Sequence, residues 1–160
     1  MSRKQQHWFL RVWIDDRAGA LTSIASAFSN RGISIDSVVG HGADKAVGFD
    51  GTVLVTFRCN EDDKDAIKRV VRRLSKVKRV EEHPYLGENL RKAVVAKVKR
   101  ELRPKDVAGE TCFITCELMS KNSTGWTYFL AGSPNQLDPI VEKLEKSDLL
   151  LDQVYSITAL

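Results

Sequence analysis

The spacing of apolar residues alternates between two periods in the first half of the chain. Between Trp8 and Ile14, bulky residues occupy both faces of a two-residue repeat, which is typical of a largely buried strand. Apolar residues from Ala20 to Phe28 then follow helical spacing, and Gly32 stands where a left-handed residue would end that helix. The rest of this half predicts a strand at 33–39, a long hairpin loop at 40–51 and a strand at 52–59. A helix from Asn60 onwards and a strand at 77–83 follow.

The second half repeats the same alternation less clearly. Strands are predicted at Ala93–Val98, Gly125–Gly132 and Leu149–Ile157, and a helix is predicted around Leu137–Leu144, with Pro134 in its first turn. The pattern between residues 100 and 121 is mixed, because Thr111–Leu118 can alternate as a strand or continue a helix from Asp106. A helix at Asp106–Ile114 and a strand at Cys116–Lys121 would complete a second set of six elements.

These elements predict an α+β protein with two ferredoxin-like βαββαβ domains, each a four-stranded antiparallel sheet with its helices on one face. The expected boundaries are 1–84 for the first domain, 85–90 for a linker and 91–160 for the second domain. Phe9 and Trp13 alternate out of phase with the helix-facing residues of their strand. We therefore expect the other face of the first sheet to pack on a second domain or on a second copy of the chain.

The first strand is followed by an acidic glycine turn, Asp15–Leu21, that leads directly into a helix. The first N–H groups of a helix have no partner within the helix and can hold the carboxylate of a small ligand. Gly19 has no side chain, which permits close approach of such a ligand to the backbone. The turn therefore suggests a sensor rather than a catalyst.

Composition fits a soluble globular protein. Hydrophobic residues make up 42% of the 160, no apolar run approaches the roughly 20 residues of a membrane span, and no secretory segment precedes the first strand. We expect a cytoplasmic protein. Three cysteines, Cys59, Cys112 and Cys116, lack the paired spacing of a zinc site, which predicts reduced, packed thiols and no metal.

No catalytic pattern is evident. His7, His41 and His83 are predicted at surface or linker positions without a nearby nucleophile motif, and no glycine-rich phosphate loop occurs. We therefore expect no catalytic residues and no cofactor of the chain's own.

The net charge of +4 is concentrated between residues 64 and 79, where eight basic residues accompany one acid, Asp65. The basic residues are Lys64, Lys68, Arg69, Arg72, Arg73, Lys76, Lys78 and Arg79. Such a cluster can contact nucleic acid or an acidic protein surface. However, apolar residues within it keep helical spacing and no aromatic residue is interleaved to stack on bases. The pattern favours a solvated face or a protein contact over nucleic acid.

The first half resembles an ACT domain, a small-molecule-binding module of many regulators of amino-acid biosynthesis. The resemblance rests on Asp16–Leu21, Ile24, Phe28 and Arg31–Ser37, which are similar to that family's D-R-x-G-x-L turn and R-G-x-N-I-x-S strand entry. These motifs taken alone also resemble the ACT tails of homoserine dehydrogenase and aspartate kinase.

The second half narrows the resemblance to the regulatory small subunit of acetolactate synthase, also called acetohydroxyacid synthase. Arg91–Val98 is similar to the strand that opens the second domain of that subunit. The segment from Thr127–Ser133 through Gln136–Asp138 to Leu144 is similar to its later strand and helix entry. The resemblance spans nearly the whole chain and is looser in the second half.

This resemblance implies a homodimer formed through ACT domains, with valine, leucine or isoleucine bound at the interface. The implied effector residues are Asp16, Ala18, Gly19, Ala20, Leu21, Ser34 and Ile35. Asp16 would pair with the ammonium group of the ligand, Ser34 would donate from the neighbouring protomer, and Leu21 and Ile35 would enclose its side chain. The family usually carries asparagine at the positions of Asp16 and Ser34.

Each assignment has an alternative that stays open here. Gly19 can serve the turn alone, Asp16 can cap the helix, and Leu21 and Ile35 can belong to the core. For the whole chain, the resemblance implies a non-catalytic subunit that activates the thiamine-diphosphate-dependent catalytic large subunit and transmits feedback by branched-chain amino acids. The alternatives are a free-standing ACT sensor of another enzyme or transcription factor, and a nucleic-acid-binding domain.

Overall fold

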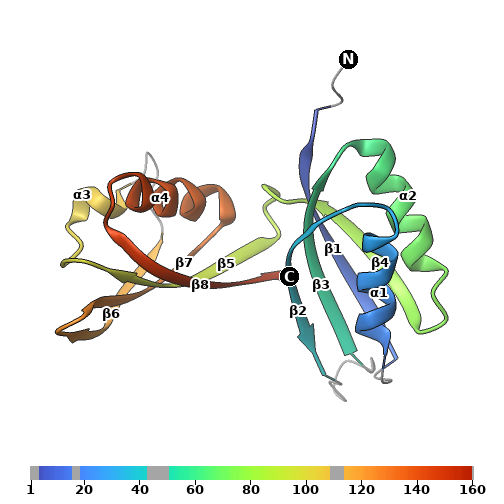
Figure 1. Cartoon of the computed structure of the whole chain (residues 1–160), viewed down its shortest axis with the longest axis horizontal. Coiled ribbons are helices and arrows are strands. Elements are labelled where there is room, and N and C mark those ends of the chain that lie inside the picture. The colour runs from blue at the N-terminus through green and yellow to red at the C-terminus, as the bar shows by residue number, and fades with distance from the viewer. Residues whose placement is uncertain (1–3, 16–18, 43–50, 109–113, 160) are drawn as a thin grey trace. The chain divides into compact units, whose positions relative to one another are not determined.

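The computed structural model describes residues 4–15, 19–42, 51–108 and 114–159, and these form two units, Met1–Gly87 and Glu88–Leu160. Each unit is a four-stranded antiparallel sheet with its helices on one face, the ferredoxin-like fold that the sequence predicts (Figure 1). Among the described helices, none is long and apolar enough to cross a membrane.

The first unit contains six elements in the predicted order: β1 (Gln6–Ile14), α1 (Ala20–Ser29), β2 (Ile35–His41), β3 (Gly51–Cys59), α2 (Glu61–Arg72) and β4 (Val77–Pro84). The strand order across the sheet is β2-β3-β1-β4. Alternate residues of β1 face the helices in a core with Ile24, Phe28 and Ile67, while Phe9 and Trp13 lie outside that core, as expected.

Both predicted helix signals of this unit are confirmed. Gly32 has φ 66°, and the N–H of the next residue, Ile33, returns to the carbonyl of Phe28 at 3.1 Å, which closes the end of α1. At the start of α2, Asn60 Oδ1 accepts the Asp63 N–H at 2.9 Å. These caps set where each helix begins and ends.

The second unit contains β5 (Leu90–Val98), α3 (Pro104–Val107), β6 (Thr115–Asn122), β7 (Gly125–Gly132), α4 (Pro134–Lys146) and β8 (Leu150–Ala159). The strand order is β6-β7-β5-β8. Val94, Ala96 and Leu130 of the central strands pack with Leu137 and Leu144 of α4. The predicted strand Gly125–Gly132 and the position of Pro134 in the first turn of α4 are confirmed.

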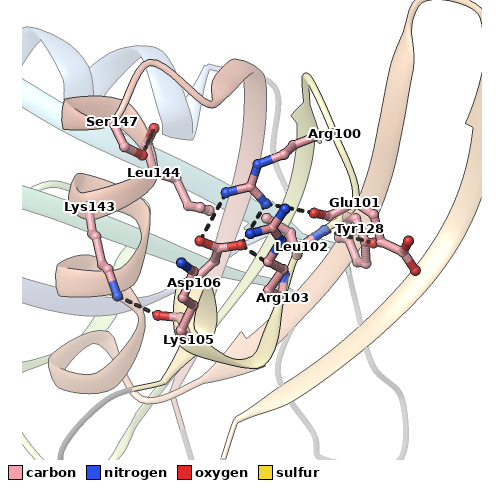
Figure 2. Close-up of polar contacts among 10 residues, drawn as sticks. All are labelled: Arg100, Glu101, Leu102, Arg103, Lys105, Asp106, Tyr128, Lys143, Leu144 and Ser147. Carbon is pink, nitrogen blue, oxygen red and sulfur yellow. Dashed lines mark hydrogen bonds and ion pairs between the residues drawn. The ribbon is translucent and has the colours of Figure 1, made fainter.

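The expected helix at Asp106–Ile114 is wrong in position. The helix α3 covers only Pro104–Val107, and Ala108 has an extended backbone (φ −76°, ψ 122°) that ends it; residues 109–113 lie outside the described chain. Asp106 is the third helical residue rather than the start. Its carboxylate accepts from the Arg103 N–H at 2.8 Å and from both terminal nitrogens of Arg100 at 2.8 and 3.2 Å (Figure 2). This bidentate pair holds a short turn where periodicity alone allows a longer helix.

Of the cysteines, Cys59 is buried as predicted, and burial raises the pKa of its thiol to about 11. The prediction of a packed thiol is wrong for Cys116, because this residue lies on the edge strand β6, whose residues are all exposed. Cys112 lies outside the described residues. Within the described ranges, no group of histidine, cysteine, aspartate and glutamate residues could hold a metal ion.

Candidate effector site

The turn between β1 and α1 has the backbone conformation that the glycine position suggests. Gly19 is the N-cap of α1 with φ 88°, in the left-handed region that favours glycine. Its carbonyl oxygen accepts the Ser23 N–H and the Ser23 hydroxyl, both at 2.9 Å. The N–H groups of Ala20, Leu21 and Thr22 precede this first helical bond, and none of the described side chains caps the helix. This geometry suits a carboxylate.

Lys76, which is distant in the sequence and was not predicted at this turn, lies beside it. A β-carbon on residue 19 would come within 3.0 Å of Lys76 Nζ. The two segments are joined by a hydrogen bond from Asp15 N–H to the Lys76 carbonyl at 2.9 Å, and Lys78 Nζ lies 3.2 Å from the Asp15 carboxylate. An ammonium group here adds positive charge to the helix N-terminus and favours an anion at the turn.

The predicted site residues differ in exposure: some are accessible to a ligand and others pack in the core. Leu21 is 48% exposed, and Ser34 is exposed directly before β2, so both side chains are accessible. Ala20 is buried in the core and Ile35 is half-buried against it, which gives these two side chains a packing role. Asp16 and Ala18 lie outside the described residues.

The fold separates the two halves of the predicted site within one chain. Ile35, next to Ser34, pairs with Phe57, which pairs in turn with Trp8 near the start of β1. Gly19 instead follows the end of β1 at Ile14. Trp8 and Ile14 are six positions apart along β1, a distance of about 20 Å. Gly19 and Ser34 therefore cannot contact one small ligand within a single chain.

The basic segment is largely engaged within the first unit. Lys64 is buried, lies over the Trp8 ring, and pairs with Asp65 at 2.9 Å and Glu82 at 3.3 Å. Burial acts to lower the pKa of Lys64, but hydrogen bonds to these two carboxylates outweigh it, so the pKa is raised. Lys68 also pairs with Glu82 at 3.2 Å. The lysines in the first turns of this segment therefore form ion pairs within the first unit.

The histidines also have structural contacts. His7 stacks on Tyr85 at 3.5 Å between ring centroids, and its Nε2 lies 3.1 Å from an Asp36 carboxylate oxygen. It is more enclosed than the surface position that the sequence predicts. His83 lies near Phe9 and 3.8 Å from Glu81, and His41 is exposed at the end of β2.

Comparison with known proteins shows similarity in both sequence and fold. The ACT domain family model matches residues 8–76, and no curated protein matches the chain. The small subunit of acetolactate synthase from Thermotoga maritima is similar in fold, with TM-score 0.69 and 15% identity over 97% of this chain and 96% of that one.

Two further structures show weaker likeness. The ligand-free regulatory subunit of aspartate kinase from Thermus thermophilus has TM-score 0.47 and 14% identity over 89% of this chain and 94% of that one. A homoserine dehydrogenase from Thiobacillus denitrificans has TM-score 0.41 and 23% identity over 51% of this chain and 18% of that one. Residues 8–76, which match the ACT domain model, cover the strands and helices from β1 to α2 of the first unit.

Proposed function

We propose that this chain is a non-catalytic regulatory subunit of acetolactate synthase. It would bind the thiamine-diphosphate-dependent catalytic large subunit, raise its activity and transmit feedback by branched-chain amino acids. In this proposal, residues 1–84 are the regulatory domain, 85–90 a linker and 91–160 the second ferredoxin-like domain. The observation that carries it is that the two ferredoxin-like units of this chain match the fold of the Thermotoga maritima small subunit over nearly the full length of both chains.

The effector would bind between two copies of the chain. Its carboxylate would accept from the N–H groups at Gly19–Leu21 with Lys76 as a nearby positive charge, and the Leu21 side chain would contact its aliphatic group. Asp16 and Ala18 complete the proposed loop. Ser34 and Ile35 would come from the neighbouring protomer, since about 20 Å of sheet separates Ser34 from Gly19 within one chain.

Regulation follows if the effector binds two arrangements of the ACT dimer with different affinity. A ligand shifts such an equilibrium only by its differential affinity for the two states. The catalytic subunit would then dock more strongly on one arrangement, and the effector and the catalytic subunit would affect each other's binding reciprocally. The chemistry itself would remain with the catalytic subunit.

Two experiments test this function. The purified chain is mixed with the catalytic subunit of acetolactate synthase from the same source, and complex formation is followed by size-exclusion chromatography. Calorimetric titration with valine, leucine and isoleucine then tests the effector. A complex with heat from at least one of them supports the proposal. An effector that binds without any complex would instead favour a free-standing ACT sensor of another enzyme or of a transcription factor.

A further inference from the structure

The second sheet has a depression on its outer face, the face opposite α3 and α4. Its volume is about 380 Å³, and it is lined by Arg91, Lys92, Ala93, Thr115, Ala131, Gly132, Ser156 and Thr158, all within the second unit. This volume lies at the lower end of the range for small-molecule sites, roughly 300–1,000 Å³.

The floor of the depression is one row of small residues across all four strands. Thr115 pairs with Ala131, Ala131 with Ala93, and Ala93 with Ser156. Their neighbours Val94 and Leu130 face α4, so this row projects to the outer face. The next row is bulkier, with Glu117, Phe129, Val95 and Val154 in register. The depression therefore ends against a partly apolar wall.

Arg91 stands at the other end of the depression with its guanidinium held in place. Its Nη1 donates to the carbonyls of Glu88 at 2.9 Å and Leu90 at 2.8 Å. Among the described residues, none accepts from Nε or Nη2, the edge that suits a carboxylate in bidentate geometry. Thr158 pairs with Arg91 across the sheet. Hydrogen-bonding groups are also supplied by the hydroxyls of Thr158, Ser156 and Thr115. No acidic residue is among the described residues that line the depression.

We propose that this depression binds a small aliphatic carboxylate. The carboxylate contacts Arg91 and Thr158, and the hydrocarbon lies over Ala93 and Ala131 towards Val95 and Val154. Val95 is 37% exposed and Val154 is 69% exposed, so both can lose apolar surface to a ligand. Successive rows of the sheet face are about 7 Å apart, so about 14 Å separates the Arg91 row from the Val95 row, and a chain of about six carbons lies over the Ala93 row between them. The site is separate from the proposed effector site and does not depend on it.

Titration of the full ¹⁵N-labelled chain, followed by amide chemical shifts, tests the proposal. The probes are hexanoate, butyrate, hexanol and inorganic phosphate, each up to about 10 mM, and hexanoate should bind at least about tenfold more tightly than hexanol or phosphate. Its shifts should saturate at Thr115, Ala131, Ser156 and Thr158. Butyrate should bind more weakly than hexanoate because it buries less apolar surface.

Matched variants separate the arginine from general charge. Arg91→Gln should weaken hexanoate binding about tenfold, while Lys97→Gln, on the same strand and face, should leave it unchanged. Ala93→Leu keeps Arg91 but fills the depression, and it should abolish saturable shifts there. The proposal is overturned if hexanoate causes no saturable shift at the four residues, or if the shifts occur only at Gly19–Leu21. Equal affinity of Arg91→Gln, or equal binding of phosphate, would also overturn it.

Discussion

The ammonium nitrogen of Lys76 lies against Gly19, 3.0 Å from the position that a β-carbon on residue 19 would take. The contact brings a residue directly before β4 to the N-terminus of α1, so that the turn combines helix N–H groups that none of the described side chains caps with a positive charge. Gly19 also has φ 88°, which side chains disfavour. The backbone conformation therefore requires glycine at this position, whereas the Lys76 ammonium group is the end of a flexible side chain that a β-carbon would displace.

Gly19→Ala should lower the free energy of unfolding by about 1–2 kcal/mol through backbone strain and should also displace Lys76 and abolish effector binding. Urea unfolding and calorimetry measure the two effects. Two control variants separate them. Gly32 has φ 66° but open space around it, so Gly32→Ala should be destabilising without loss of effector binding. A β-carbon on Gly40 would meet no atom within 4 Å, so this position should tolerate alanine. Wild-type stability of Gly19→Ala would contradict this view of the turn.

A mixture of two defective variants should recover effector binding. Gly19→Ala removes the loop half of the proposed site, and Ser34→Asp places a negative charge in the strand half. In a mixed dimer, one of the two interface sites combines Gly19 from the Ser34→Asp protomer with Ser34 from the Gly19→Ala protomer. Both halves of that site are therefore wild type.

Calorimetry on the mixture, after unfolding and refolding together, should therefore show about one quarter of the wild-type sites, since about half of the dimers are mixed. Each variant alone should show no binding. If the mixture also shows none, both halves of the site belong to one chain or the residues are wrongly assigned.

The double variant Asp16→Asn, Ser34→Asn should bind valine more tightly than the wild-type chain, by about tenfold for two added hydrogen bonds. The reason is that asparagine amides stand at these positions in the family that the sequence resembles, where they hold the amino and carboxylate groups of the ligand. Calorimetric titration measures the change. The matched control is Asn30→Asp, an exposed position at the far end of α1, which should leave valine binding unchanged. Weaker binding by the double variant would contradict this prediction and would mean that the Asp16 carboxylate holds the ammonium group better than an amide does.

Asp106→Asn should destabilise the second unit by about 2 kcal/mol, because it weakens a charged hydrogen-bond pair with Arg100. Hydrogen bonds from Arg100 and from the Arg103 N–H hold the pKa of Asp106 well below its usual range. The pair therefore contributes its full stability above the unfolded-state pKa of about 3.9, and this is lost as pH falls towards the folded-state value.

Amide hydrogen exchange at several pH values, resolved by unit, measures this contribution. Wild-type protection of the second unit should fall below pH of about 4, whereas that of the variant should change less. Asp148→Asn is the control, since its carboxylate is 89% exposed in a surface pair with Lys99. Equal loss of protection in both units of Asp106→Asn would contradict a local role.

The sequence predicts the fold well where local chemistry and periodicity agree. Gly125–Gly132 combines strand-forming residues with glycine at each end, and Pro134 marks the next helix. The prediction from sequence fails at Asp106, because the turn there depends on an ion pair with Arg100 that the spacing of apolar residues does not reveal. In the candidate site, Gly19 and Leu21 lie in one local motif. Lys76 is distant in the chain, and only the pairing of β1 with β4 brings it to the turn.

The most direct measurement is the rate of acetolactate formation by a purified catalytic subunit as this chain is added in increasing amounts. A regulatory subunit should raise the rate severalfold, and the rise should saturate at a fixed ratio of the two proteins. Valine, leucine or isoleucine should then change the saturated rate in the wild type but not in Gly19→Ala. An unchanged rate at every ratio, with no complex between the two proteins, would contradict the proposed function.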